Sequence, residues 1–383
     1  MAMNISRRNL LKTSGLALGT GLSLQLSAFS EVTNASSTEP LIRLSFNENP
    51  YGPSPRVAEA IQRELSRLNR YADASAAQRL AEQIAAHERL PVQQVVLGEI
   101  LGLLGTVLAS EGGPGSEFLY STPGYLALID AAARLGGVCV PVPLNARYEN
   151  DLAALSNRIT PRTRAIYLVN PHNPTGTVSE NQAFKQFLSA SSAHAVAIVD
   201  EAYLEYTDDF NQRTAVSLVR EGANVAVFRT FDKIHGLAGL PIGYVLAPRS
   251  LADTLRRQGA GDAEALGRLN IAAASAALSD TAQVVRARDA VARERAIWLG
   301  VLRDLNLKHT ETHANFVFFD AGQTQPKLAE ALRARGVEIG RAHPPFTNWA
   351  RITIGLPEEN LRAQTALRQV LQQRSIQAID QER

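Results

Sequence analysis

Ala165–Val169 reads Ala-Ile-Tyr-Leu-Val, Ala195–Val199 reads Ala-Val-Ala-Ile-Val, and Val225–Phe228 reads Val-Ala-Val-Phe. Each stretch is short and apolar at consecutive positions, which is typical of a strand that is buried on both faces of a sheet. Helical segments such as Glu180–Ser189 separate most of these strands. Strands that alternate with helices predict an α/β fold in which helices cover both faces of a mainly parallel sheet.

Polar residues follow three of these predicted strands. Asn173 comes shortly after the first, Asp200 directly after the second, and Lys233 shortly after the third. Sites in such sheets gather at the carboxyl ends of the strands, so we expect these side chains to lie near one another. A structural alternative for Asp200 is the N-cap of a helix, and for Asn173 a simple turn beside Pro174.

The same periodicities extend the prediction outward along the chain. Further helices are predicted over Arg56–Asn69, Ala76–Leu90, Ala272–Leu305, Lys327–Arg335 and Glu358–Arg374, and further strands over Phe118–Tyr120, Val138–Val142, Asn315–Phe319 and Arg351–Ile354. We therefore expect an N-terminal arm over 36–70, a large domain over 71–275 and a smaller C-terminal α/β domain over 276–383. The boundary between the two domains is expected within the helical Ala272–Leu305 stretch.

The first 35 residues have the pattern of an export signal. Arg7, Arg8 and Lys12 precede a mildly apolar run, Thr13–Phe29, that is rich in Leu, Gly, Ala and Ser. The adjacent arginines resemble the twin-arginine type, so we expect a periplasmic protein after removal of residues 1–35. No stretch approaches the roughly 20 apolar residues that a stable membrane span requires.

Composition excludes several classes of protein. The 383 residues are 45% hydrophobic and 20% charged, which is ordinary for a globular chain and ample for a large core. The formal net charge is only +2, so nucleic acid is not an expected partner. The single cysteine, Cys139, excludes an intrachain disulfide framework and a cysteine-rich metal site, and no metal is expected.

Several motifs, taken in order, resemble one enzyme family. These motifs are Asn47–Pro53, Asn170–Gly176, Val199–Tyr203, Thr230–Lys233, Gly236–Gly239, Gly243-Tyr244 and Arg351–Gly355. With them the chain resembles, over about residues 41–371, the class I/II aminotransferases that depend on pyridoxal phosphate, and in particular their histidinol-phosphate aminotransferase branch. The resemblance implies the fold-type I architecture of these transferases and pyridoxal 5'-phosphate as cofactor.

The resemblance also assigns roles to individual residues. Lys233 would be the catalytic lysine that forms the Schiff base, and Asp200 would pair with the pyridine nitrogen. Among the other cofactor-binding residues, Asn173 and Tyr203 would hold the ring hydroxyl oxygen, and Tyr125 would stack on the ring. The remaining assignments are Thr230 and Tyr71 toward the cofactor phosphate, the latter across a homodimer interface, and Arg351, Asn49 and Tyr51 toward the substrate. Ordinary alternatives are core packing for the tyrosines and a surface ion pair for Arg351.

The chain departs from the family at the residues expected to hold the cofactor phosphate. The family usually has serine before the lysine and arginine eight positions after it, where this chain has Asp232 and Pro241. The expected phosphate loop reads Glu99–Gly102 instead. A carboxylate repels a phosphate dianion, so we expect backbone amides, Thr230, Tyr71 and a relocated cation to take over, with Arg229 and His235 as nearby candidates.

The predicted activity is transfer of an amino group between an amino acid, or a related amine, and a 2-oxo acid. The identity of the substrate is not readable from the residues. Other chemistry on the same cofactor (decarboxylation, β-elimination or racemisation) is one alternative. A catalytically silent ligand-binding homologue, suggested by Asp232 and Pro241, is another.

Overall fold

The computed structural model describes residues 40–381, with side chains through residue 373, and these residues belong to one compact unit. The predicted signal therefore lies outside the described residues. Within the described part, no helix combines the length and apolarity that a membrane crossing requires.

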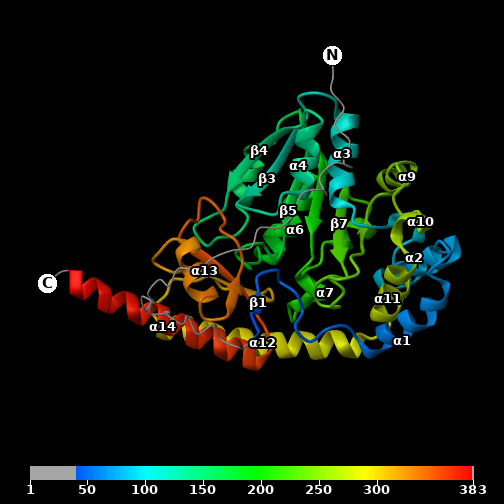
Figure 1. The fold of residues 1–383 in the computed structure, drawn as a ribbon. Helices are drawn as coiled ribbons and strands as arrows, with labels where there is room; N and C mark the ends of the chain where they lie inside the picture. Colours follow the sequence, from blue (N-terminus) through cyan, green and yellow to red (C-terminus); the bar gives the residue numbers. More distant parts are fainter. Residues whose placement is uncertain (1–39, 382–383) are drawn as a thin grey trace, which may run out of the picture. The chain divides into compact units, whose positions relative to one another are not determined.

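A seven-stranded sheet forms the centre of the fold (Figure 1). Its strands, in spatial order, are β2 (Val95–Leu97), β8 (Gly243–Leu246), β7 (Val225–Thr230), β6 (Val196–Asp200), β5 (Thr163–Val169), β3 (Glu117–Thr122) and β4 (Val138–Pro143). Strand β8 is antiparallel to both of its neighbours, whereas β3 to β7 pair in parallel. The predicted α/β fold with a mainly parallel sheet is confirmed, and five of these strands match the sequence prediction to within two residues at each end.

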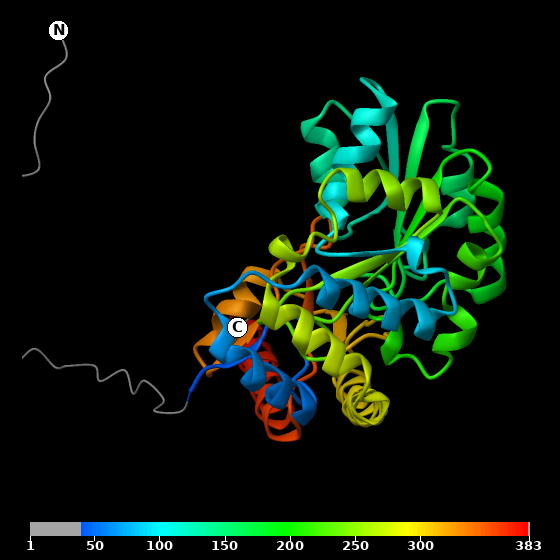
Figure 2. The same cartoon turned by 90° about the vertical axis from the view of Figure 1, so that its right-hand side faces the viewer.

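Helices cover both faces of this sheet, as the apolar strands require (Figure 2). One face packs against α2 (Ala74–Glu88), α6 (Asn181–Ser191), α8 (Val216–Arg220) and α11 (Arg268–Leu278). The other face packs against α3 (Leu101–Gly112), α4 (Ala127–Arg134) and α9 (Arg249–Arg257). Four further helices belong to this part of the described chain: α1 (Pro55–Glu64), α5 (Leu152–Ser156), α7 (Phe210–Arg213) and α10 (Ala263–Leu266).

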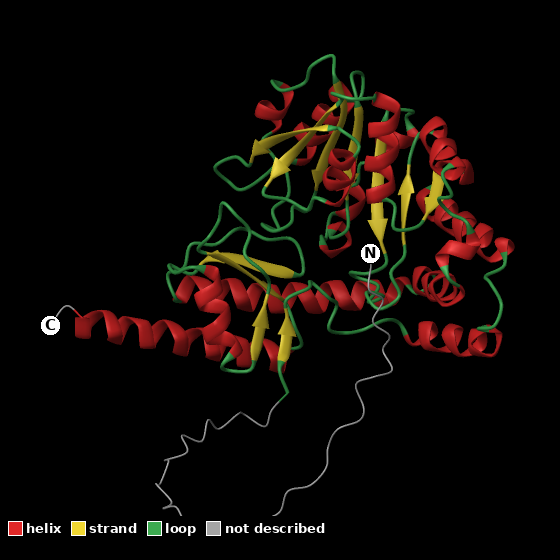
Figure 3. Cartoon of the chain, turned by 45° about the horizontal axis from the view of Figure 1, so that its top comes forward, coloured by secondary structure: helices red, strands yellow, loops and turns green. Residues whose placement is uncertain are grey.

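A separate apolar cluster joins the C-terminal elements to the start of the described chain. It contains α12 (Thr281–Asp304), α13 (Gln325–Arg333) and α14 (Pro357–Gln381) and two strand pairs, which Figure 3 shows apart from the seven-stranded sheet. The strand pairs are β9 (Phe316–Asp320) with β11 (Trp349–Thr353), and β1 (Ile42–Leu44) with β10 (Val337–Ile339). Strand β1, which falls within the predicted N-terminal arm, thus completes a sheet of the C-terminal part.

The predicted helical stretch over Ala272–Leu305 is interrupted. The structure has two helices there, α11 and α12, separated at Ser279 and Asp280. The carboxylate of Asp280 accepts hydrogen bonds from the amide of Gln283 and from the hydroxyl of Ser54, 2.5 Å away. Asp280 is thus the N-cap of α12, and its side chain satisfies a backbone donor that a continuous helix would have paired internally.

Candidate active site

A cavity of about 210 Å³ lies at the carboxyl ends of the central strands. Strand β6 contributes Asp200, strand β7 contributes Phe228 and Thr230, and the N-terminus of α3 closes one side. The lining residues are Glu99, Leu101, Gly102, Tyr125, Ala127, Val169, Asn173, Asp200, Ala202, Tyr203, Phe228, Thr230, Asp232 and Lys233. Six of the seven predicted cofactor-binding residues therefore line one cavity.

Asp200 is the buried acid of this cavity, with only 3% of its surface exposed. Its carboxylate accepts hydrogen bonds from the hydroxyl of Tyr167 and from the amide of Ala202, both at 3.0 Å. Burial raises the pKa of Asp200 to about 6, because an apolar setting disfavours the charged form more than these two donors favour it. A cation next to this carboxylate would therefore be strongly favoured.

Among the described residues that line the cavity, Lys233 alone carries an ammonium group. It follows β7 by three residues and is partly buried. Within the described residues its side chain forms no hydrogen bond or ion pair at contact distance. Its positive charge nevertheless lowers the pKa of Asp200, Glu99 and Asp232, against the larger effect of burial. A lysine amine in a cavity beside a buried acid is the arrangement expected of a reactive amine rather than of a surface lysine.

A hydrogen-bond network connects Tyr203, Asn173 and Arg351. The hydroxyl of Tyr203 accepts a bond from the side-chain amide of Asn173 at 3.4 Å and one from that of Asn47 at 3.0 Å. The carbonyl oxygen of the Asn173 side chain in turn accepts from Arg351 Nη1 at 2.7 Å. Arg351 Nη2 donates to the carbonyl of Ser45, and Arg351 Nε is buried without a partner. Arg351 is thus a buried residue at the site and not a surface ion pair.

The remaining sequence candidates occupy different places. Tyr125 lines the cavity and is 46% exposed, so one face of its ring is accessible to a ligand. Tyr71 is 76% exposed and does not line the cavity, so it is not a core tyrosine. Asn49 is held by a bond to the carbonyl of Ile234, and Tyr51 packs against the C-terminal core; neither lines the cavity.

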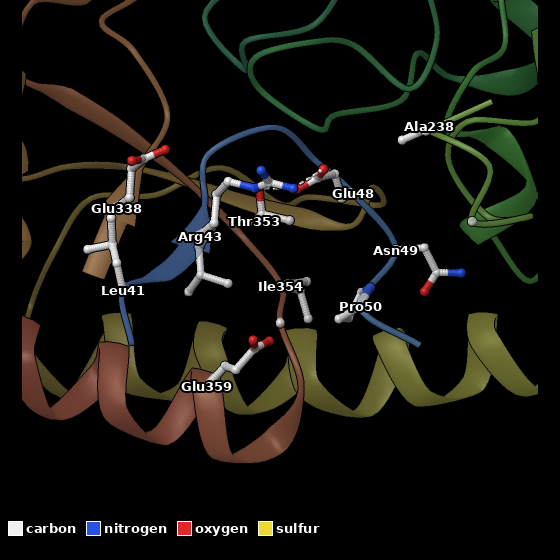
Figure 4. Close-up of a pocket in the computed structure, with 14 residues that line it drawn as sticks. Leu41, Arg43, Glu48, Asn49, Pro50, Ala238, Glu338, Thr353, Ile354 and Glu359 are labelled. Atoms are coloured by element: carbon white, nitrogen blue, oxygen red, sulfur yellow. Dashed lines mark hydrogen bonds and ion pairs between the residues drawn. The ribbon is translucent and has the colours of Figure 1, made fainter. Parts of the chain in front are cut away.

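Asn49 instead lines a larger cavity of about 600 Å³ (Figure 4). The close-up shows Arg43 paired with Glu48, while Glu338 and Glu359 come from the C-terminal part. The volume is greater, yet this cavity contains neither the lysine nor the buried acid. The chemistry of the candidate site therefore belongs to the smaller cavity.

Two further carboxylates line the smaller cavity near the start of α3. Glu99 precedes the helix, and loss of water around its carboxylate, followed by repulsion from Asp232, raises the pKa of Glu99 to about 7. Burial also raises the pKa of Asp232, against the opposing effect of Lys233. Thr230 lies beside them, and its hydroxyl oxygen accepts a bond from the amide of Asp232 at 3.0 Å. This end of the cavity is acidic.

The expectation that Arg229 or His235 supplies a relocated cation is wrong. Arg229 is buried on the opposite side of β7, where its guanidinium bonds Glu201, Thr214 and Glu88. His235 faces Glu205, with 3.3 Å between Nε2 and the carboxylate oxygen. Neither residue lines the cavity.

Sequence reasoning did not single out two residues that position the site. Tyr167 donates to Asp200, and the signal for it is a lone hydroxyl-bearing residue within the apolar run Ala165–Val169. Asn47 donates to Tyr203 and adopts a left-handed backbone with φ of 55°. It lies in the Asn47–Pro53 motif, but only the tertiary structure brings this motif to Tyr203.

Comparison with known proteins identifies the family. Residues 39–366 match the family described as aminotransferase class I and II, and the chain belongs to this family. It is 33% identical over 348 residues to a histidinol-phosphate aminotransferase of Moorella thermoacetica, covering 89% of this chain and 88% of the relative. It is 34% identical over 319 residues to an aromatic amino acid aminotransferase of Thermobifida fusca, covering 83% and 87%.

Solved structures agree with this assignment. The histidinol-phosphate aminotransferase of Sinorhizobium meliloti in complex with pyridoxal 5'-phosphate superposes with a TM-score of 0.78 at 26% identity, covering 91% of this chain and 99% of that one. A putative histidinol-phosphate aminotransferase from Erwinia carotovora gives a TM-score of 0.80 at 28% identity, covering 87% and 96%. The protein has the fold-type I architecture of the pyridoxal-phosphate-dependent aminotransferases.

The cavity suits the ring of this cofactor better than its phosphate. Asp200 offers a buried anion for a protonated ring nitrogen, Lys233 an amine, and Asn173 with Tyr203 polar groups for the ring oxygen. At Glu99 and Asp232, by contrast, the lining has carboxylates where the family usually has groups that hold the phosphate. The residues fit the ring and do not fit the phosphate.

The structural role of Arg229 can be tested by Arg229→Met. Because this substitution leaves Glu88 and Glu201 buried without their cation, we expect a loss of about 3–5 kcal/mol in the free energy of unfolding, measured with urea. A combined variant with Glu88→Gln and Glu201→Gln should recover part of the loss. Unchanged stability of Arg229→Met would contradict this role.

The raised pKa of Asp200 predicts a stability that depends on pH. A carboxyl whose pKa rises from 3.8 unfolded to about 6 folded stabilises the folded state below pH 4, and this contribution is lost as the pH rises through 6. In the cofactor-free chain, Asp200→Asn should therefore be more stable than wild type at pH 8, by on the order of 2–3 kcal/mol, and lose this advantage toward pH 4. Urea unfolding at both pH values measures the difference; equal stabilities at pH 8 would refute it.

Proposed function

We propose that this protein carries out pyridoxal-phosphate-type transamination in the cavity between Asp200 and Lys233. The observation that carries the proposal is the meeting of a buried carboxylate and an uncommitted lysine amine in one cavity, with Asn173 and Tyr203 beside them. Membership of the aminotransferase class I and II family gives the reaction class. The substrates of this class are amino acids and 2-oxo acids.

The residues divide the work of the reaction. When bound, the cofactor supplies an electron-withdrawing ring that acidifies the α-proton of an amino acid. Asp200 would keep the ring nitrogen protonated, since its buried carboxylate gains most from an adjacent cation. Lys233 Nζ would take the proton from the substrate Cα and deliver it to the neighbouring carbon. Tyr125 would cover one face of the ring, and Tyr203 with Asn173 would hold the ring oxygen.

Arg351 would orient the substrate through its α-carboxylate. Its guanidinium is held from two sides by Asn173 and by the carbonyl of Ser45, and it lies 5.5 Å from the centre of the Phe316 ring. The planar guanidinium is thus held in a fixed orientation, and its fork of donors matches the geometry of a carboxylate. Asn49 and Tyr51, which belong to the Asn47–Pro53 motif, remain proposed substrate-binding residues.

Location and assembly are further parts of the proposal. The Arg7-Arg8 pair and the apolar run after it support export to the periplasm by the twin-arginine route. The exposed Tyr71 supports a homodimer in which this residue contacts the neighbouring subunit's site. Cell fractionation tests the proposed export, and a protein found in the cytoplasm would exclude it. The mass of the protein in solution tests the proposed homodimer, and a monomer would exclude it.

Lys233→Ala should abolish covalent capture of the cofactor. The purified wild type, mixed with pyridoxal phosphate, should develop visible absorbance, and borohydride should fix the label on the peptide that contains Lys233. The variant should show neither, whereas Lys327→Ala, on the exposed face of α13, should behave as wild type. Absorbance and label that persist in Lys233→Ala would refute the proposed site.

Product analysis with a panel of amino and oxo acids then separates transamination from decarboxylation, elimination, racemisation or silent binding.

Arg351→Lys should weaken binding of the substrate more than binding of the cofactor. Because lysine lacks the planar guanidinium and its fixed fork of donors, we expect the KM for the amino donor to rise about tenfold or more while the visible absorbance of the bound cofactor is retained. Steady-state kinetics measure the first effect and a spectral titration the second. An unchanged KM would exclude Arg351 from carboxylate binding.

A further inference from the structure

We propose that the cavity selects a vitamin B6 ring whose 5' substituent carries no negative charge, so that the unphosphorylated vitamers pyridoxal and pyridoxamine bind in preference to their phosphate esters. This inference rests on the proposed function, since it concerns the same cavity. It goes beyond that function because it assigns the chemical class of the ligand at the end of the cavity formed by Glu99 and Asp232.

The charges of the lining favour this selection. The cavity contains three carboxylates (Glu99, Asp200 and Asp232) and one ammonium, that of Lys233. Among the charged groups that act on Glu99, Asp232 has the strongest influence, ahead of Lys233 and Asp200. Glu99 and Asp232 are therefore electrostatic neighbours. Asp200 would be balanced by a protonated ring nitrogen, which leaves two carboxylates facing the 5' substituent.

Asp232 has little freedom to leave this position. Its backbone amide donates to the hydroxyl of Thr230, and it directly precedes Lys233. Its Oδ1 atom is buried and has no hydrogen-bond partner within the described residues. A buried carboxylate oxygen without a donor is unfavourable, and a second anion nearby would add repulsion to this cost. A phosphate dianion has no proton to give to this carboxylate, whereas a neutral hydroxymethyl group adds no charge.

Nearby cations do not neutralise these carboxylates. Arg229 is committed to Glu88 and Glu201 on the other side of β7, and His235 to Glu205. Lys233 is the only cation that lines the cavity, and it is the group expected to react with the ring aldehyde. No cation among the described lining residues is thus left to pair with a phosphate.

The N-terminus of α3 acts in the opposite direction. Its free amides and dipole amount to about half a positive charge, which would favour an anion. At pH 8, above the pKa of Glu99, the two carboxylates outweigh this effect, since together they carry more negative charge than the helix end carries positive charge. The balance of the lining is therefore against the phosphate ester.

Calorimetric titration of the purified full chain with pyridoxamine and with pyridoxamine 5'-phosphate at pH 8 tests the inference. These two probes differ only in the phosphate and need no reaction with Lys233. For the wild type we expect the dissociation constant of the phosphate ester to exceed that of pyridoxamine by about tenfold or more. Glu99→Gln and Asp232→Asn should each reduce this ratio about tenfold, whereas Glu82→Gln, on the exposed face of α2, should leave it unchanged.

The outcomes separate this inference from the proposed function. Tighter binding of the phosphate ester by the wild type overturns the inference, whatever the variants do, while the proposed function stands if absorbance with pyridoxal phosphate depends on Lys233. If neither probe binds and no such absorbance develops, both fail. The wild-type comparison requires no substitution, so a variant that fails to fold does not prevent a decision.

Discussion

The site depends on the parallel pairing of β5, β6 and β7. Val169 pairs with Asp200, and Asp200 with Phe228, so β5 and β6 end at the same level of the sheet and β7 ends two residues beyond them. The loops that follow these ends carry Asn173, Ala202 with Tyr203, and Asp232 with Lys233 to one cavity. Parallel strands need helical crossovers, and the crossovers bury both faces of the sheet, so the chemistry lies at the carboxyl ends of the strands.

Successive side chains of a strand point to opposite faces of the sheet, which separates neighbouring charged residues. Asp200 reaches the cavity, whereas the next residue, Glu201, reaches Arg229 on the other side, and both carboxylates are fully buried. A shift by one residue would exchange the two environments. Glu201 has a guanidinium partner, whereas the hydrogen-bond donors to Asp200 are neutral, and burial raises the pKa of both carboxyls. Glu201 is thus paired within the structure, whereas Asp200 is left to interact with a cation on a ligand.

Much of this arrangement could be predicted from the residues. The apolar runs indicated the strands, their spacing indicated helical crossovers, and the polar residues after Val169 and Val199 marked the edge of the sheet. The pattern did not predict the break at Asp280, because the residues on both sides favour helix and the hydrogen bond from Ser54 is made at long range. The pairing of β1 with β10 was missed for the same reason, since these short strands have few residues and distant partners.

The sequence by itself determined the order of the elements, the family and the residue types available for the reaction, because these follow from local periodicity and from motifs whose spacing is fixed along the chain. Only the tertiary structure decided which charges face each other. Arg229 and Asp232 are three residues apart, yet one is buried in a structural network and the other lines the cavity. Electrostatic energy depends on distance and solvent exposure, and neither can be read from sequence separation.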